Sequence, residues 1–209
     1  MTSLQRKGIA FVLCAPSGTG KTTLVRRLEE VTSNFSFSIS YTTRKPRDGE
    51  VHGKDYFFVS REDFIEKRDA HFFAEWAEVH GNFYGSPLGQ IQELLDAGKD
   101  ILFDIDVQGA AQLKKNLEHT FCVFLLPPSR DSLFSRLRGR STDDEPTICK
   151  RVNNAQGEIE NASWFDAVVV NDDLDLASKE LEACYVAATL SPRLVNGRLV
   201  KLLKEWVDG

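Results

Sequence analysis

Residues 15–23 combine glycines, a lysine and threonines in an order that suits the binding of phosphate groups. The segment consists of Ala15, Pro16, Ser17, Gly18, Thr19, Gly20, Lys21, Thr22 and Thr23. Glycines let consecutive backbone N–H groups point at one spot, and a helix that begins there adds the positive end of its dipole. Lys21 is expected to reach the outer phosphates, and the Thr22 hydroxyl is a candidate ligand for Mg²⁺. The segment therefore predicts a site for a polyphosphate and its metal ion.

The sequence on either side of this segment favours the same interpretation. The spacing follows the pattern G-x-x-x-x-G-K-[ST], except that Ala15 stands where the first glycine is usual. An apolar run over 8–14 predicts a strand before the loop, and apolar residues at helical spacing over 22–31 predict a helix after it. The alternative is a glycine-rich turn that binds nothing, and the flanking strand and helix count against it.

Two arginines in a segment rich in glycine indicate a second anion site. Arg44 and Arg47 flank Pro46, and Gly49 and Gly53 follow them. Proline and glycine predict a loop rather than a helix here, which leaves the two guanidinium groups free to converge. A guanidinium fork matches phosphate oxygens in two-point contacts, so the loop predicts a second phosphate-binding site.

The segment 38–56 resembles the GMP-binding signature of guanylate kinases. It reads Ser-x-Ser-x-Thr-Thr-Arg-x-Pro-Arg-x-Gly-Glu-x-x-Gly-x-Asp-Tyr. The resemblance runs from about residue 8 to 181 and includes the segments 75–77, 81–86, 105–109, 139–140 and 171–173. It implies an α/β fold: a P-loop NTPase core with a parallel five-stranded sheet, an inserted α+β GMP-binding lobe and a small helical lid. The implied reaction transfers the γ-phosphoryl of ATP to GMP with Mg²⁺ and gives ADP and GDP.

The resemblance also implies which residues bind GMP. The clamp on its phosphate is implied to be Arg44, Arg47, Tyr56 and Tyr84, and the guanine readers Ser40, Glu75 and Ser86. Glu50 is implied to position the arginine loop. Tyr56 and Tyr84 have an alternative interpretation as packing residues with satisfied hydroxyls, since aromatic side chains more often pack than bind. Trp76 is interpreted as core.

On the ATP side, the implied contacts are residues 15–23 and Asn171, the latter near adenine. The candidate catalytic residues are Lys21, Arg44, Arg136, Arg140 and Arg151, of which the last three resemble lid arginines. For Arg136 the alternative is a solvated helix face. Asp104 and Asp106 lie two apart on a predicted strand, hence on one face at its carboxyl end. Asp104 with Thr22 is the candidate Mg²⁺ site, and Asp106 is expected to face the nucleotide.

The candidate site residues must be held in place by a folded core, and apolar runs in the sequence predict the strands of that core. Strand-like runs lie at 8–14, 35–40, 101–106, 121–126 and 167–170. Helical segments between them indicate a parallel sheet covered on both faces, with binding at the carboxyl ends of its strands. Two insertions interrupt the alternation and divide a single domain into a core (1–40, 99–135 and 158–209), a GMP-binding lobe (41–98) and a lid (136–157).

Inside the lobe, β-like pieces are expected at 56–59 and 72–79, and helices are expected to begin at Ser60 and at 86–87. The second of these helices should end at Gly98. The tail over 191–206 predicts a docked terminal helix whose first turn Gly197 would weaken.

Composition limits the remaining possibilities. The chain has 209 residues and a net charge of −5, which counts against nucleic acid as a partner. Its four cysteines lie far apart without a C-x-x-C pair, which fits a reducing cytoplasm. No apolar stretch approaches the ~20 residues of a membrane span, and the expected partners are ATP and GMP alone. The sequence makes no prediction of oligomeric state.

Two rival functions remain open at this stage. A P-loop kinase with another small-molecule acceptor would share residues 15–23 but has no reason to carry the 40–56 signature together with Glu75. A non-catalytic guanylate-kinase-like interaction domain would keep the lobe and let the phosphate loop decay. Measuring ADP release in the presence of ATP, Mg²⁺ and GMP separates all three.

Overall fold

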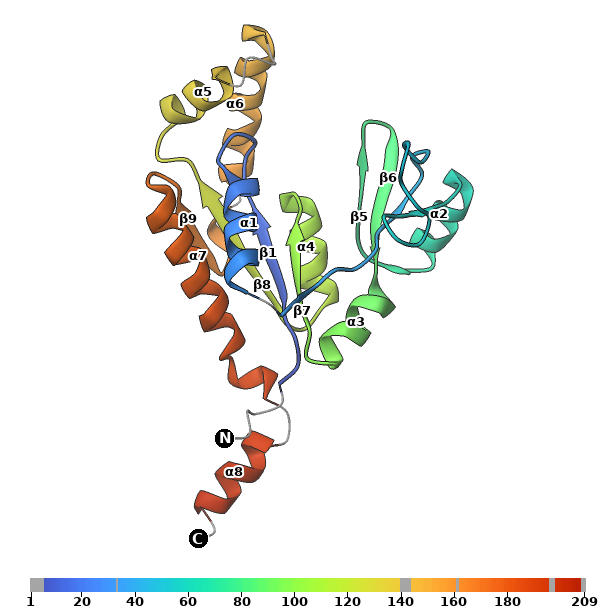
Figure 1. Ribbon diagram of the computed structural model, residues 1–209, viewed down its shortest axis with the longest axis vertical. Coiled ribbons are helices and arrows are strands. Elements are labelled where there is room, and N and C mark those ends of the chain that lie inside the picture. The colour runs from blue at the N-terminus through green and yellow to red at the C-terminus, as the bar shows by residue number, and fades with distance from the viewer. Residues whose placement is uncertain (1–5, 33, 140–143, 161, 196–197, 208–209) are drawn as a thin grey trace.

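The predicted parallel sheet is present, and five strands form it in the order β2-β7-β1-β8-β9 (Figure 1). The computed structural model describes residues 6–32, 34–139, 144–160, 162–195 and 198–207. The strands are β1 (Ala10–Cys14), β2 (Phe35–Ser36), β7 (Asp100–Asp104), β8 (Thr120–Leu126) and β9 (Ala167–Val170). Each pairing between them is parallel, so their carboxyl ends meet at one edge of the sheet.

Helices cover both faces of the sheet because alternate residues of a strand point to opposite sides. These helices are α1 (Lys21–Val31), α3 (Leu88–Asp96), α4 (Val107–Asn116) and α7 (Leu174–Thr189). Phe11 and Leu13 of β1 share one apolar cluster with the buried residues of α1 and α7. Val12, between them, belongs to the cluster that α3 and α4 complete. A bilayer-spanning helix does not occur among the described helices.

The predicted inserted lobe contains a second sheet, in the order β4-β3-β6-β5. Its elements are β3 (Tyr41–Thr42), β4 (Phe57–Phe58), α2 (Arg61–Asp69), β5 (Phe73–Val79) and β6 (Asn82–Pro87). Ser60 caps α2 as expected, accepting a 3.0 Å hydrogen bond from the Asp63 N–H. Phe64 stacks on Phe73 and on Phe83 at ring-centroid distances of 4.4 and 5.2 Å. The lobe therefore has a small core of its own.

A pair of helices, α5 (Arg130–Arg138) and α6 (Glu145–Ile159), occupies the region predicted as a lid. Their apolar faces form a separate cluster that contains Leu133, Leu137, Ile148, Val152 and Ala155. The first helix begins at Arg130, six residues before the expected start of the lid, because the Ser129 hydroxyl caps it.

Several predicted bounds were wrong. The strand expected over 35–40 ends at Ser36, and the one expected over 101–106 ends at Asp104. Asp106 leaves the strand because its carboxylate accepts a 2.8 Å hydrogen bond from Gly109 N–H and caps α4. It therefore does not share a strand face with Asp104. Ser86 lies inside β6, and Pro87 rather than Ser86 is the N-cap of α3, so the helix expected to begin at 86–87 starts about one residue late; its C-cap is Ala97, which agrees with the predicted end at Gly98.

The prediction that the terminal helix docks on the core was also wrong for residues 198–207, the part of this helix that the structure describes. Two short 3₁₀ segments, η1 (Ala162–Trp164) and η2 (Pro192–Leu194), precede α8 (Arg198–Val207). Figure 1 shows α8 lying away from the sheet, and the Trp206 side chain is 86% exposed. Leu194, 2% exposed, contributes to the core instead. Gly197 lies outside the described residues.

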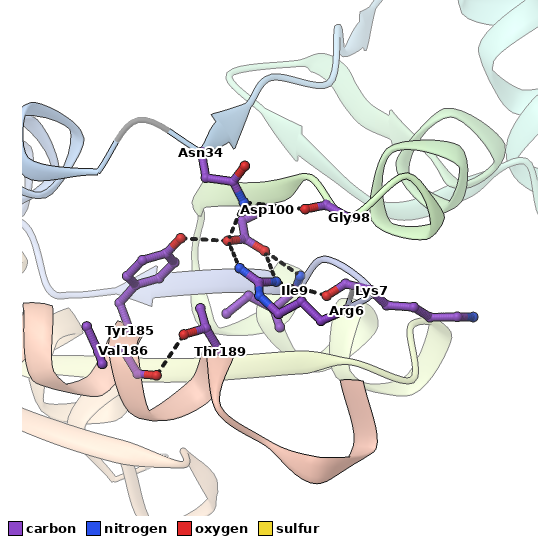
Figure 2. A network of polar contacts seen from close by, with 9 residues as sticks. All are labelled: Arg6, Lys7, Ile9, Asn34, Gly98, Asp100, Tyr185, Val186 and Thr189. Carbon is purple, nitrogen blue, oxygen red and sulfur yellow. Dashed lines mark hydrogen bonds and ion pairs between the residues drawn. The ribbon is translucent and has the colours of Figure 1, made fainter. Parts of the chain in front are cut away.

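A buried carboxylate at the amino end of β7 joins four segments of the core (Figure 2). Asp100 is fully buried and accepts two hydrogen bonds from Arg6, at 2.7 and 2.6 Å. It also accepts bonds from Ile9 N–H at 2.9 Å, Asn34 at 3.0 Å and the Tyr185 hydroxyl at 2.6 Å. Burial opposes ionisation, but these donors outweigh it and hold the pKa of Asp100 below its ordinary value. The network therefore joins the N-terminal segment, the residue before β2, the start of β7 and α7.

Candidate active site

The segment 15–23 forms a tight loop between β1 and α1. Gly18 and Gly20 have φ angles of 93° and 98°, which L side chains rarely adopt. Thr19, between them, is buried, and its hydroxyl donates a 2.7 Å hydrogen bond to the Pro16 carbonyl. A Cβ atom on Gly20 would lie 2.5 Å from Asn171 Nδ2. The backbone conformation therefore depends on glycine at both positions, as a phosphate-binding loop requires.

Lys21 and Asp104 form an ion pair at the carboxyl edge of the sheet. They come from the ends of neighbouring elements, since β1 pairs with β7 in a register that sets Leu13 against Asp104. The Asp104 carboxylate remains 43% exposed, and Thr22 follows Lys21 in the first turn of α1 with an exposed side chain. A cation, a carboxylate and a hydroxyl therefore lie together beside the loop.

Two predicted lid arginines reach the loop from α5 and α6. Arg136 donates to the Asn171 carbonyl at 2.8 Å and to the Thr19 carbonyl at 3.4 Å. Arg151 donates to the Ser17 hydroxyl. Arg140 lies outside the described residues. The interpretation of Arg136 as a merely solvated side chain is therefore wrong.

Asn171 lies beneath the loop. Its side chain is almost fully buried, and its Nδ2 donates a 2.7 Å hydrogen bond to the Thr19 carbonyl. The amide is therefore engaged with the loop backbone, and its predicted contact with adenine stays a prediction.

A cavity of about 410 Å³ brings the two predicted sites together. From the core it is lined by Lys21, Ser40, Asp104 and Asp106, and from the lobe by Tyr56, Glu75, Tyr84 and Ser86. Asp106 thus faces the cavity even though it caps a helix. Lining residues that the sequence did not predict include Phe37, Ala77, Val79 and Ile105. They lie in segments that were predicted as strands, but an apolar strand residue does not show by its type whether it packs in the core or lines a cavity.

One wall of the cavity holds a buried carboxylate in a chain of hydrogen bonds. Glu75 is 7% exposed and accepts a 2.6 Å hydrogen bond from the Ser86 hydroxyl. Ser86 lies opposite Glu75 in the β5–β6 register, and its oxygen is also 3.3 Å from the Ser40 hydroxyl. Burial raises the pKa of Glu75, and the nearby Asp106 charge adds to this, while the Ser86 bond opposes it. The predicted readers thus converge on one point.

The arginine loop is organised around Glu50. Its carboxylate accepts two hydrogen bonds from the Arg44 guanidinium, at 3.0 and 2.8 Å, and one from the Arg47 N–H at 2.7 Å. The Arg44 contact and the Arg47 N–H hold the pKa of Glu50 below its ordinary value. The Arg44 guanidinium also lies 5.5 Å from the ring centroid of Tyr56, and Tyr84 packs edge-on against Tyr56. The Arg47 side chain is exposed, and neither arginine is among the described residues that line the cavity.

The sequence is similar to one described family over most of its length. It matches the family model for guanylate kinase over residues 7–188. A curated guanylate kinase from Nitratidesulfovibrio vulgaris is 60% identical over 204 residues, which covers 98% of this chain and 99% of the relative. One from Lawsonia intracellularis is 51% identical over 199 residues, covering 95% and 94%. The crystal structure of guanylate kinase from Anaplasma phagocytophilum superposes with a TM-score of 0.71 at 33% identity, covering 98% of this chain and 97% of that one.

Proposed function

Because this chain belongs to the guanylate kinase family, we propose that its cavity holds GMP against the lobe while the phosphate loop presents ATP. The reaction is transfer of the γ-phosphoryl of ATP to GMP, which gives ADP and GDP. The assignment of ATP and GMP to different sides of the cavity rests on one observation. A single cavity is lined by Lys21 and Asp104 on one side and by Glu75 and Ser86 on the other. Such a cavity can hold a donor and an acceptor within reach of each other.

Glu75 is proposed to select the base. Guanine presents an N1–H and a 2-amino group on one edge, whereas adenine presents an N1 acceptor there and has no 2-amino group. A carboxylate has only acceptor atoms, so it pairs with both donors of guanine and meets adenine N1 lone pair to lone pair. Ser86 holds the Glu75 carboxylate at 2.6 Å, and Ser40 extends the same polar wall.

The arginine loop is proposed to hold the phosphate of GMP. Glu50 fixes the Arg44 guanidinium by two hydrogen bonds, which leaves part of its donor fork for a ligand. Arg47 is exposed on the same loop, and the Tyr56 and Tyr84 side chains line the cavity beside it. The fork geometry of arginine suits two-point contacts with phosphate oxygens, which orient the acceptor for in-line attack.

On the donor side, residues 15–23 are proposed to cradle the phosphates of ATP. Lys21 would stabilise charge on the transferring group, and Arg136, Arg151 and the undescribed Arg140 would do so from the lid. Arg136 and Arg151 already contact the loop at Thr19 and Ser17, which supports this assignment. Asn171 is proposed to lie near adenine.

Mg²⁺ is proposed to bind between Thr22 and Asp104. The donors present fit this ion, because Mg²⁺ prefers hard oxygen ligands and takes one or two from the protein, with phosphates and waters supplying the others. The described residues contain no group of three or more His, Cys, Asp or Glu side chains that could hold a metal ion. When bound, the ion would neutralise charge on the β- and γ-phosphates. Asp104, now paired with Lys21, would exchange that contact for the ion, and Lys21 would turn to the phosphates.

The proposed location is the cytoplasm, and the proposed partners are ATP and GMP without nucleic acid or membrane. Cys14, Cys122, Cys149 and Cys184 are all free, which agrees with a reducing compartment. The net charge of −5 disfavours non-specific binding to a polyanion.

The test is a coupled assay of ADP release with ATP and Mg²⁺, in which GMP, IMP and AMP are compared as acceptors. We expect rapid release with GMP, weaker release with IMP and very little with AMP, because buried polar pairing can discriminate by ~10⁴-fold or more. Equal release with all three acceptors would contradict the proposed base reading. ADP release that does not depend on any acceptor would contradict the proposed transfer to GMP.

A further inference from the structure

The strand that carries Glu75 lies at the edge of its sheet. In the order β4-β3-β6-β5, only β6 pairs with β5. An edge strand presents N–H and C=O groups on its outer side, and without partners there it is free to shift. The position of the base-reading carboxylate therefore depends on what holds the outer side of β5.

Two amide side chains of α4 bind this outer side. Gln112 Oε1 accepts a 3.1 Å hydrogen bond from the Trp76 N–H, and Gln112 Nε2 donates a 2.9 Å bond to the Trp76 carbonyl. One turn later, Asn116 Nδ2 donates a 2.8 Å bond to the Ala74 carbonyl. Gln112 thus makes the pair of bonds that a neighbouring strand would make.

Glu75 lies between the two residues that α4 holds. Because the backbone is fixed on both sides of it, the carboxylate cannot move along the strand or away from the core. The same helix also carries a second carboxylate of the cavity lining, since Asp106 caps it. Gly109 in its first turn leaves room for the carboxylate, because a Cβ there would lie 3.3 Å from Glu75 Oε2. One helix thus sets the place of Glu75 in the cavity.

We propose that Gln112 is a positioning residue for base selection, which sets where Glu75 meets the guanine edge by its two hydrogen bonds to Trp76. The inference rests on the proposed reading of guanine by Glu75. Gln112 is not among the described residues that line the cavity, so it acts through the strand rather than by touching GMP. Its position on a helix gave no sign of this role in the sequence.

The experiment compares GMP with IMP, which keeps the N1–H but lacks the 2-amino group. The ratio of kcat/KM for GMP to that for IMP therefore measures how well Glu75 reaches the amino group. Gln112→Met keeps the length of the side chain and removes both bonds to Trp76. We expect it to lower this ratio about tenfold, while KM for ATP stays within about twofold.

Two further variants separate positioning from folding. Gln112→Glu keeps the size and an acceptor for the Trp76 N–H but loses the donor, so the ratio should fall by an intermediate amount. If Gln112→Met does not fold, the GMP-to-IMP ratio of Gln112→Glu tests the inference in its place. Gln92→Met makes the same change on the exposed side of α3 and should leave the ratio unchanged.

A double-mutant comparison completes the test. In the Glu75→Gln background, Gln112→Met should have almost no effect on the GMP-to-IMP ratio, because the two residues act as a unit. An equal loss for GMP and IMP, or additive effects in the double mutant, overturns the inference. If Glu75→Gln lowers the ratio and neither Gln112 variant does, this inference alone fails. If Glu75→Gln leaves the ratio unchanged, the proposed base reading fails and the inference with it.

Discussion

The Ser86 hydroxyl donates a 2.6 Å hydrogen bond to Oε1 of Glu75, across the β5–β6 register that pairs the two residues. This bond holds a buried carboxylate in one orientation without neutralising it. The second oxygen, Oε2, has no such partner from Ser86 and lies near the start of α4. This arrangement agrees with the proposed pairing of the Glu75 carboxylate with the two donors of the guanine edge.

Glu75→Gln should lower kcat/KM for GMP by at least ~10²-fold, roughly 3 kcal/mol, because an amide donor then faces a guanine donor. Steady-state kinetics with saturating ATP measure this. Glu78→Gln, an exposed change on the same strand, is the matched control and should have little effect. A Glu75→Gln enzyme within a few-fold of the unchanged protein, or one equally impaired in ATP binding, would sink the assignment.

As pH is lowered, kcat/KM for GMP should begin to fall at a higher pH than it would if Glu75 had the pKa of an ordinary glutamate. Burial and the Asp106 charge raise the pKa of Glu75 above its usual 4.5, and only the carboxylate accepts both guanine donors. The protonated form becomes populated as pH falls through the raised pKa, so kcat/KM for GMP should fall with it. The contribution of Glu75 to the free energy of unfolding has the opposite pH dependence. It increases as pH falls, because the pKa of Glu75 is higher in the folded state than in the unfolded state.

The measurement is the pH profile of kcat/KM for GMP, set beside that of Glu75→Gln. The profile of the variant should still show the second ionisation of the GMP phosphate, which has a pKa of about 6, but it should lack the fall in kcat/KM that is due to protonation of Glu75. Superimposable profiles for the two proteins would show that Glu75 does not titrate in this role.

The core of this site could be predicted from the sequence because local patterns encode it. Glycines at 18 and 20 adopt the positive φ that their spacing indicated, and apolar runs gave the five strands. The strand β6 could not be predicted, since Gly85 and Pro87 interrupt its pattern and its pairing with β5 stabilises it. Asp106 was misplaced for a similar reason, because a helix cap competes with strand extension at that position.

Contacts between distant segments were beyond the reach of a pattern. Gln112 belongs to α4 of the core and Trp76 to β5 of the inserted lobe, so the two residues meet only when the lobe is folded against α4. The prediction for the terminal helix was wrong for a different reason. Its apolar spacing predicted an amphipathic helix, which forms, but spacing does not say what covers the apolar face.

Lys21→Met should lower kcat by at least ~10²-fold while the affinity for GMP changes little. Lys21 is the cation of the phosphate loop, and its partner Asp104 is exposed enough to be solvated when the lysine is removed. Single-turnover rates and equilibrium binding of GMP measure the two effects. Lys115→Met, on the exposed side of α4, is the control. A kcat close to normal would remove Lys21 from the mechanism.

Arg47→Lys should raise KM for GMP clearly and KM for ATP much less, because lysine keeps the charge but loses the two-point fork. The loop itself should not move, since Glu50 binds the backbone N–H of residue 47 and not its side chain. Arg27→Lys, in an exposed pair with Asp175 on the far face, is the matched control. A parallel rise of both KM values would show that the loop is not a dedicated acceptor site.

Asp100→Asn should lower the free energy of unfolding by about 3 kcal/mol, because it leaves Arg6 without its buried partner charge. For a chain of this length the melting temperature should fall by about 6–12 °C. Asp96→Asn, which removes only the surface pair with Lys7, should cost under about 1 kcal/mol. Calorimetry of the three proteins at neutral pH measures these differences.

The pH dependence of that loss identifies its cause. The donors around Asp100 hold its pKa in the folded protein below the unfolded value of about 3.9, so the stability it contributes is present above that value. It is lost as pH falls toward the folded pKa, because the carboxylate then becomes protonated and resembles the amide. The difference in melting temperature between the unchanged protein and Asp100→Asn should therefore be constant from pH 6 to 8 and narrow below about pH 4. A difference that stays constant into acid would mean that the shape of Asp100, not its charge, is what contributes to the stability of the core.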